Sequence, residues 1–360
     1  MKTNSDMVLS VEGLRTEFRT DDGTVRAVDG VSLGLARGCV LALVGESGCG
    51  KTVTAYSILR LIRPPGHLAG GSIVLRPDDG QPVDLAALGD GSRELRAIRG
   101  NRVAMIFQEP MSALSPVHTV GDQIDEVLLL HAGVDRREAR RRTVEMLRRV
   151  GIPSPETRAD QFPHEMSGGM RQRAVIAMAL VCRPEVLIAD EPTTALDVTI
   201  QAQILHLIKE LQAENGCSVL FITHDLGVVA QMADEVAVMY LGRIVESGPV
   251  REVLKNPRHP YTAGLLASRP GASAARHLPV IAGQVPSLHA IPSGCPFHPR
   301  CAHRLPGLCD AGPAPALEEI SPRHHSACLR SKELTGLLRT PSASSASSAS
   351  SAIPSSVIHP

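Results

Sequence analysis

The sequence contains no tryptophan, few other aromatic residues and no excess of either charge. Tyr, Phe and Trp together make up 2% of the 360 residues, which argues against a platform of rings that stacks on bases or sugars. Lys plus Arg and Asp plus Glu both number 37, whereas proteins that coat nucleic acids usually have a basic excess. We therefore expect no nucleic-acid partner.

Long apolar runs are also missing. A helix that spans a bilayer needs about 20 apolar residues. The best run here, 174–182, lies between Arg173 and Arg183. The first ten residues lack the basic stretch and apolar stretch of a secretory signal. We expect a cytoplasmic chain that reaches a membrane only through partner proteins.

Strands and helices are predicted to alternate along most of the sequence. Continuous apolar runs at 39–45, 103–107 and 186–190 are typical of strands buried on both faces of a parallel sheet. Segments with helical spacing lie between such runs, and this alternation predicts an α/β fold with a mostly parallel core sheet. The pattern at 8–35 predicts further strands before the first of these runs.

Changes in composition divide the chain. We predict a first domain over residues 1–270, with a helical subdomain at about 115–180 inside it. Residues 271–335 are rich in Pro, His and Cys and have weak periodicity, so they predict a separate small module. Residues 336–360 end in a low-complexity Ser/Ala tract and are predicted to be a disordered tail.

The motif GESGCGKT at residues 45–52 lies between a predicted buried strand and a helix predicted over 51–62. It fits G-x-x-x-x-G-K-[ST], in which glycines let backbone N–H groups point at a phosphate. Lys51 would supply charge to the β- and γ-phosphates, and the Thr52 hydroxyl would contact Mg²⁺. The predicted nucleotide-binding residues are Gly45, Glu46, Ser47, Gly48, Cys49, Gly50, Lys51 and Thr52.

Two adjacent carboxylates, Asp190 and Glu191, follow an apolar run that predicts a buried strand. A plain strand end is the simpler interpretation of such a pair when it stands alone. In a chain with a phosphate-binding loop, the pair predicts that Asp190 orders the Mg²⁺ shell and that Glu191 is the general base toward the attacking water.

A second anion-binding turn is predicted at MSGGMRQR, residues 166–173. Ser167, Gly168 and Gly169 precede a helix, whose N-terminus favours an anion. One nucleotide has no evident use for two such cradles on a single chain.

With these motifs in this order, residues 8–265 resemble the ABC ATPase family. In that family the Ser-Gly-Gly turn is the signature motif and completes the ATP site of a facing subunit. The resemblance implies a P-loop NTPase fold of the ABC type, with a mixed core sheet, an antiparallel β subdomain and a helical subdomain. It also implies ATP and Mg²⁺ as cofactors.

The resemblance implies further site residues. Phe18 would stack on adenine, and Gln108 would be the Q-loop glutamine that contacts Mg²⁺ and responds to the γ-phosphate. Asp197 ends TALD (194–197), which is similar to the D-loop, and His224 is similar to the switch histidine. Met170 departs from the family pattern, in which Gln usually follows the signature. Because the cradle consists of backbone and Ser167, no loss of the cradle is expected, and only a direct contact to the opposite nucleotide is open to weakening.

Segments 189–204, 223–230 and 256–266 resemble the ATPase subunits of dipeptide, oligopeptide and nickel importers. This implies a subunit at the cytoplasmic face of the bacterial inner membrane that couples ATP hydrolysis to uptake of di- or oligopeptides. Its partners would be a second ATPase subunit (a sibling chain), two transmembrane permease subunits and an extracytoplasmic solute-binding protein. Nickel or glutathione import remains open, as does a non-transport ABC ATPase.

Four of the eight cysteines, Cys295, Cys301, Cys309 and Cys328, lie within 34 residues near the end. In a reducing cytoplasm such clustered thiols suggest a metal rather than disulfides. Their long spacings lack the short knuckles of structural zinc sites. The importer resemblance implies a [4Fe–4S] cluster on these residues, with Zn²⁺, free thiols or disulfides as the alternatives.

Overall fold

The computed structural model describes residues 6–109, 113–194, 197–268 and 280–338. The predicted disordered tail lies almost wholly outside these ranges, and so do Ala195 and Leu196 of the predicted D-loop. Within the described ranges the strands form two sheets, one with eight strands and one with four.

The eight-stranded sheet is the centre of the molecule. Its strand order is β11-β12-β10-β9-β3-β8-β7-β6, in which β9, β3, β8, β7 and β6 run parallel and the other three continue it as an antiparallel edge. The strands are β3 (Val40–Val44), β6 (Val103–Ile106), β7 (Val186–Asp190), β8 (Ser218–Thr223), β9 (Glu235–Tyr240), β10 (Arg243–Pro249), β11 (Glu318–Ser321) and β12 (His324–Ser326). Every residue of β3, β6, β7 and β8 is buried, which is why these segments are apolar without alternation.

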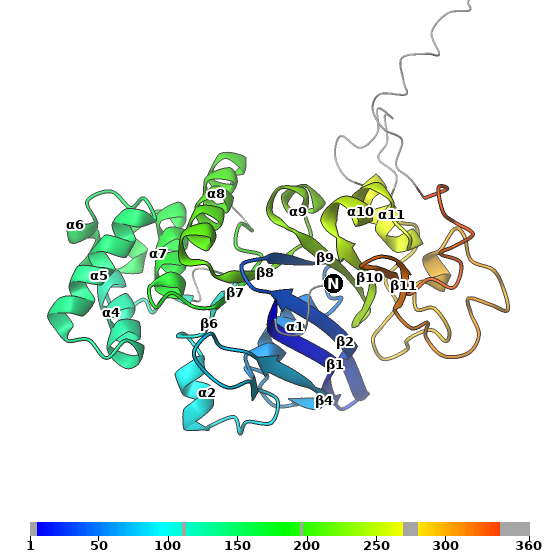
Figure 1. Ribbon diagram of the computed structural model, residues 1–360, viewed down its shortest axis with the longest axis horizontal. Coiled ribbons are helices and arrows are strands. Elements are labelled where there is room, and N and C mark those ends of the chain that lie inside the picture. The colour runs from blue at the N-terminus through cyan, green and yellow to red at the C-terminus, as the bar shows by residue number, and fades with distance from the viewer. Residues whose placement is uncertain (1–5, 110–112, 195–196, 269–279, 339–360) are drawn as a thin grey trace, which may run out of the picture.

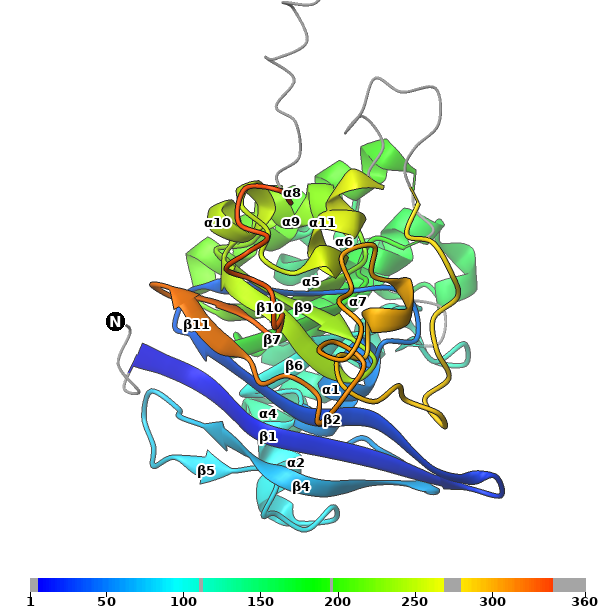
Figure 2. The same ribbon diagram turned by 90° about the vertical axis from the view of Figure 1, so that its right-hand side faces the viewer.

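The four-stranded sheet is antiparallel and covers one face of the main sheet. Figure 2 shows it as a layer of its own below the main sheet. Its side chains share a hydrophobic core with Leu41, Leu43 and Ile188 of the central strands. In the order β2-β1-β4-β5, the strands are β1 (Met7–Thr20), β2 (Gly23–Ala36), β4 (Gly66–Leu75) and β5 (Val83–Asp84).

Most helices cover the opposite face and the ends of the sheet, whereas the helical residues Ala55, Ile58 and Ile98 share the hydrophobic core of the four-stranded sheet. Figure 1 shows α4 to α7 gathered at one end of the molecule and the residues after 280 at the other. The helices are α1 (Lys51–Ile58), α2 (Arg93–Ile98), α4 (Val120–His131), α5 (Arg136–Arg149), α6 (Pro155–Ala159), α7 (Gly168–Leu180), α8 (Val198–Asn215), α9 (Leu226–Met232), α10 (Val250–Lys255) and α11 (Pro260–Ala267), with short 3₁₀ turns η2 (Pro163–Glu165) and η3 (His298–Arg300). None of the described helices combines the length and the apolar character needed to cross a bilayer.

Helix α1 is shorter than the sequence predicts. The predicted helix extends to Ile62, but the observed one ends at Ile58. Arg60 adopts a left-handed conformation with φ of 56°, and the N–H of Leu61 turns back to the carbonyl of Tyr56 at 2.7 Å. The left-handed residue ends the helix and changes the direction of the chain. The apolar residues beyond it keep helical spacing in the sequence although they are not in the helix.

The residues after 280 are joined to the main sheet through β12, which pairs with β10. The fully buried carboxylate of Glu246 on β10 strengthens this joint. It accepts hydrogen bonds from the backbone N–H groups of Arg258 and His259 at 2.7 and 2.9 Å, and it contacts His324 of β12 at 2.7 Å. The predicted boundary at residue 270 stays a prediction, and strands from beyond it complete the edge of the sheet.

Glu246→Ala should lower the free energy of unfolding by about 3 kcal/mol, because it leaves buried donors without an acceptor. Denaturant unfolding would measure the loss. The control is Glu333→Ala, whose side chain is largely exposed and pairs with Arg330, and which should change the stability by about 0.5 kcal/mol or less. Equal losses in the two variants would contradict this account of Glu246.

Candidate active site

The carboxyl ends of four adjacent parallel strands meet at one edge of the main sheet. The neighbouring strands are β3, β8, β7 and β6. Each of them has a predicted site residue at its carboxyl end or within two residues after it. In that strand order these residues are Gly45, His224, Asp190 and Gln108. Strand β8 lies between the strand of the phosphate loop and the strand of the acidic pair.

The phosphate loop packs so closely against its neighbours that two of its glycines have no room for a side chain. A Cβ on Gly45 would lie 2.3 Å from the carbonyl oxygen of Met239, and one on Gly50 would lie 2.3 Å from that of Ala27. Gly50 also has φ of 106°, where other residues are strained. The loop is therefore held in one shape by contacts with β2 and β9.

Lys51 begins helix α1 and is almost fully buried. Its ammonium donates hydrogen bonds to the carbonyl oxygens of Gly45 at 2.8 Å and Glu46 at 3.0 Å. The charge of Lys51 is thus concentrated inside the loop, where the predicted phosphates would lie.

Asp190 is the last residue of β7 and is completely buried. Burial raises the pKa of Asp190 to about 6, although Thr52 and Lys51 lie close enough to oppose the rise. Neither carboxylate oxygen has a hydrogen-bond partner among the described residues. Two buried acceptors without donors fit a site for a hard cation such as Mg²⁺.

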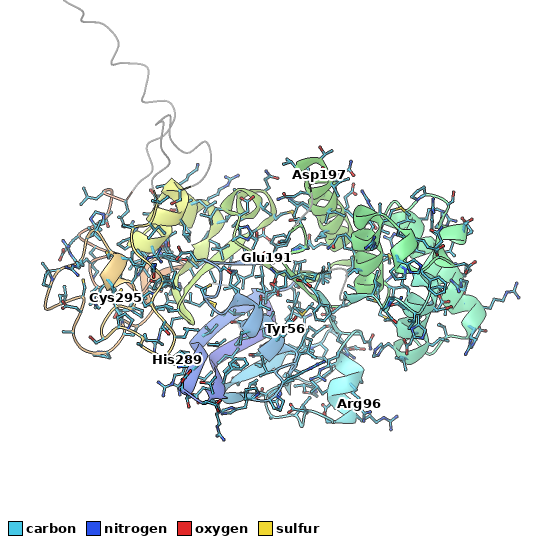
Figure 3. The ribbon with its side chains drawn as sticks, turned by 180° about the vertical axis from the view of Figure 1, so that it is seen from behind. Tyr56, Arg96, Glu191, Asp197, His289 and Cys295 are labelled. Carbon is cyan, nitrogen blue, oxygen red and sulfur yellow. The ribbon has the colours of Figure 1, made fainter. Side chains whose placement is uncertain are left out.

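Glu191 is the meeting point of the predicted catalytic residues. His224 Nδ1 lies 3.1 Å from Glu191 Oε1, while Thr194 Oγ1 donates to Oε2 at 2.8 Å and Gln108 Nε2 approaches Oε2 at 3.4 Å. Figure 3 places Glu191 near the middle of the molecule. The structure therefore brings Gln108 and His224 together around one carboxylate, from residues that are 83 and 33 positions away in sequence.

The backbone conformation of Glu191 is unusual, and the pKa of its carboxyl is shifted. Its φ of 46° is left-handed, a conformation that non-glycine residues adopt mainly where their surroundings hold them. Burial raises the pKa of Glu191, but the hydrogen bonds from His224 and Thr194 outweigh burial and keep this pKa below its ordinary value. The carboxylate is consequently charged at neutral pH and available as a proton acceptor.

The signature residues lie on a different element from the phosphate loop. Ser167 is the N-cap of α7, and its Oγ accepts a hydrogen bond from the N–H of Met170 at 3.3 Å. Ser167 and Gly168 are exposed, while Met170 packs partly against the hydrophobic core of the helices. The turn is thus open to solvent on its outer side.

Phe18 and Asp197 both have structural contacts within the fold. Phe18 is on β1, packed so closely on Gly66 that a Cβ there would lie 2.6 Å from the Phe18 ring. Asp197 caps α8 by accepting hydrogen bonds from the N–H groups of Thr199 and Ile200, both at 3.0 Å. Adenine stacking by Phe18 and a D-loop role for Asp197 stay predictions.

Three residues that hold the site belong to none of the predicted site motifs. Gln172 of α7 is buried and donates to the carbonyl of Pro192 at 2.6 Å, so it ties the signature helix to the loop after Glu191. The hydroxyl of Tyr261 accepts from the N–H of Glu46 at 2.9 Å, and Arg300 pairs with the carboxylate of Glu46. No sequence signal could have found the last two, because they are 215 and 254 residues from Glu46.

The four clustered cysteines line one small cavity, and all of them are free thiols. Burial, together with a smaller effect of the neighbouring sulfurs, raises the pKa of Cys295 to about 11 and that of Cys328 to about 12. Across the described residues, no three His, Cys, Asp or Glu side chains are arranged to hold a metal ion.

Two family profiles match the chain. The ABC transporter profile matches residues 28–194, and that of the oligopeptide/dipeptide transporter C-terminal region matches residues 245–309. The first contains the phosphate loop, the signature and the acidic pair. The second contains three of the four clustered cysteines.

Individual proteins are similar over most of the chain. A putative peptide import ATP-binding protein of Brucella abortus is 55% identical, over 91% of this chain and 98% of that protein. The dipeptide transport ATP-binding protein DppD of Bacillus subtilis is 52% identical, over 85% of this chain and 89% of that protein.

A solved structure shares the fold. It is the dimeric structure of the ATP-binding cassette MJ0796 in a post-hydrolysis state, bound to ADP and phosphate. It has a TM-score of 0.59 and 26% identity, and it covers 68% of this chain and 99% of that one. Together with the relatives and the geometry around Glu191, this likeness shows that the chain belongs to the ABC transporter family of ATP-hydrolysing subunits, in the group with the oligopeptide/dipeptide transporter C-terminal region.

Proposed function

We propose that this chain is the ATP-hydrolysing subunit of an importer for dipeptides or oligopeptides, peripheral to the cytoplasmic face of the bacterial inner membrane. The single observation that carries the proposal is the convergence of Gln108, Thr194 and His224 on Glu191. Glu191 follows β7, and only β8 lies between β7 and the strand of the phosphate loop. The peptide substrate class is supported by the relatives, which are named as peptide import and dipeptide transport proteins.

The residues divide the work of ATP hydrolysis among them. Lys51 and the backbone of residues 45–52 bind the phosphates, and a buried ammonium is an effective partner for them because little water screens it. Glu191 accepts the proton of the attacking water, and His224 and Thr194 orient its carboxylate. Mg²⁺, when bound by Asp190, Thr52 and Gln108, would neutralise charge on the phosphates.

A facing ATPase subunit completes the proposed site. Ser167, Gly168 and Gly169 lie at the start of α7, on an element apart from the phosphate loop, and their exposed turn is suited to a nucleotide held by another chain. The dimer reported for the related cassette supports this arrangement. ATP between two subunits would favour the closed dimer, and hydrolysis would release it.

The remaining partners follow from the same importer assignment. Two transmembrane permease subunits would form the channel, and a solute-binding protein outside the membrane would select the solute. The second ATPase subunit is proposed to be a sibling chain. Peptide length is then determined mainly by these partners and not by the ATPase subunit.

Glu191→Gln should reduce ATP hydrolysis by at least about 100-fold while ATP binding is retained, because the amide keeps the shape but cannot accept the proton. Phosphate release and equilibrium binding of ATP by the assembled transporter would measure the two effects. Glu145→Gln, on the exposed face of α5, is the matched control. Hydrolysis at the wild-type rate by the Glu191→Gln variant would refute the general-base assignment.

Thr194→Val should lower kcat by about tenfold, the effect of losing a hydrogen bond to a charged group. It should also shift the acidic limb of the kcat/KM profile to higher pH, because the lost bond helps to keep the pKa of Glu191 low. Thr194→Ser keeps the hydroxyl and should leave the profile in place. A shift of the limb to lower pH in the valine variant would contradict the role of Thr194.

We also propose that Cys295, Cys301, Cys309 and Cys328 hold a [4Fe–4S] cluster. The support is that all four thiols line the same cavity although the chain between them is irregular. As they lie, the thiols are not arranged to hold a metal ion, so binding of the cluster would have to draw the four sulfurs together. Burial raises the pKa of Cys295, Cys301 and Cys328, so a cationic centre is needed to hold these three as thiolates. When bound, the cluster would join four segments of a region that has little hydrophobic core of its own.

Iron and zinc analysis of anaerobically purified protein, together with visible absorption, would test the cluster. We expect iron in the wild type, loss of iron in Cys328→Ser, and retention of iron in Cys39→Ser, whose thiol lies outside the cavity. Stoichiometric zinc without iron would overturn the proposal in favour of a structural zinc site.

A further inference from the structure

Glu46, the second residue of the phosphate loop, is held from outside the loop by an arginine near the other end of the chain. Arg300 Nη1 and Nη2 donate to the two carboxylate oxygens of Glu46 at 2.7 and 3.0 Å. This two-pronged geometry is the strongest that an arginine and a carboxylate form, and a lysine cannot reproduce it.

The Arg300 side chain is only 4% exposed, so its charge is removed from water. Its Nε donates to the carbonyl of Ala282 at 3.3 Å, and its guanidinium lies 5.9 Å from the ring centre of Tyr240 and 6.0 Å from that of Phe297. Rings at this distance stabilise a cation. Arg300 is therefore fixed by its surroundings before it pairs with Glu46.

Aromatic residues are concentrated at this contact. The chain has three tyrosines and five phenylalanines, and Tyr240, Tyr261 and Phe297 pack together with ring centres 4.7 to 5.3 Å apart. Tyr261 is the same residue whose hydroxyl accepts from the N–H of Glu46. The cluster thus gives the phosphate loop a rigid support on its outer side.

Arg300 belongs to the segment that carries the cysteines. It ends the 3₁₀ turn η3 and directly precedes Cys301. The N–H groups of His298 and Cys301 donate to the carbonyls of Cys295 and His298, at 2.9 and 3.2 Å. The position of the guanidinium is consequently set by the backbone that joins two of the clustered thiols.

Glu46 is restrained at three points. Arg300 holds its carboxylate, Tyr261 holds its N–H, and the Lys51 ammonium is hydrogen-bonded to its carbonyl. Lys51 must turn from this carbonyl toward a phosphate, whereas the other two restraints come from outside the loop and need not change. Fixing the backbone of a residue costs conformational entropy, so prior ordering of Glu46 improves nucleotide affinity.

We propose that Arg300 is a positioning residue for ATP binding: by holding Glu46, the cysteine-bearing segment orders the phosphate loop. The inference rests on the proposed ATP site at residues 45–52. Because coupling between two sites is reciprocal, ATP in the loop stabilises the segment around Arg300. Arg300 has no part in the chemical step, so its loss acts on ATP affinity and leaves turnover at saturation intact.

The test is ATP hydrolysis and equilibrium ATP binding by the assembled transporter with Arg300→Met, Arg300→Lys or Arg304→Met. We expect Arg300→Met to raise both KM and Kd for ATP by about tenfold, with kcat within about twofold of the wild type. Arg300→Lys keeps the charge and should recover part of the affinity. Arg304 is an exposed arginine of the same segment, and its variant should match the wild type.

A double-mutant cycle keeps the test valid if Arg300→Met folds poorly. Glu46→Gln leaves the cysteine segment unchanged and should raise KM to a similar degree. Combining it with Arg300→Lys should add little further loss, because both changes weaken the same contact. Unchanged KM in Glu46→Gln, or fully additive losses, would overturn the proposal.

Hydrogen exchange of residues 295–309 with and without ATP gives a readout apart from activity. Exchange should slow with ATP in the wild type, and this effect should be lost in Arg300→Met. Equal protection in both proteins would overturn the proposal. Failure of the ATP site itself is separate, because it would appear as wild-type protein that binds no ATP, or as Lys51→Ala with unchanged binding.

Discussion

The parallel arrangement of β3, β8, β7 and β6 is the constraint on which the site depends. Parallel neighbours all point their carboxyl ends the same way, so the loops that follow them share one edge of the sheet. Segments that are far apart in sequence thereby provide a phosphate loop, two carboxylates, a glutamine and a histidine to a single place. An antiparallel neighbour would have sent its loop to the opposite edge.

The backbone at Glu191 is strained, and hydrogen bonds stabilise the strained conformation. The left-handed backbone turns the carboxylate toward Thr194 and His224, and its N–H is still satisfied by the carbonyl of Ile222 at 2.9 Å. Asp190, one residue earlier, is in a contrasting environment, completely buried and without donors among the described residues. Adjacent acids thus differ in pKa, which suits one to a cation and the other to proton transfer.

The C-terminal region contacts the rest of the fold through one strand and two carboxylates. Strand β12 extends the main sheet, and Arg300 pairs with Glu46 of the phosphate loop. The Glu246 carboxylate on β10 makes hydrogen bonds with the backbone at Arg258 and with His324 of β12. The Glu246 carboxylate and the Arg300 side chain are both buried, and each has its charged or hydrogen-bonding partners in place. Because such contacts are strong only when both partners are in place, they are the physical basis of the proposed coupling between this region and the phosphate loop.

Much of the fold and most of the site follow from local sequence. Continuous apolar runs indicate strands buried on both faces, and glycines in the phosphate loop are required wherever a Cβ would collide with a neighbouring carbonyl. The residues that converge on Glu191 were selected from short motifs and their resemblance to a family. Local pattern was less informative about helix α1, since the left-handed turn at Arg60 leaves no mark in the apolar spacing.

What sequence patterns could not supply is any contact between distant segments that have no motif of their own. Gln172 against Pro192, Tyr261 against Glu46 and Arg300 against the same carboxylate are made by side chains whose local sequence carries no signal of the contact. A motif is a short stretch of residues that indicates one chemical role. The support of that chemistry comes from whichever side chains the packed sheet and its edge strands bring within hydrogen-bonding distance, and packing of that kind is a property of the whole chain.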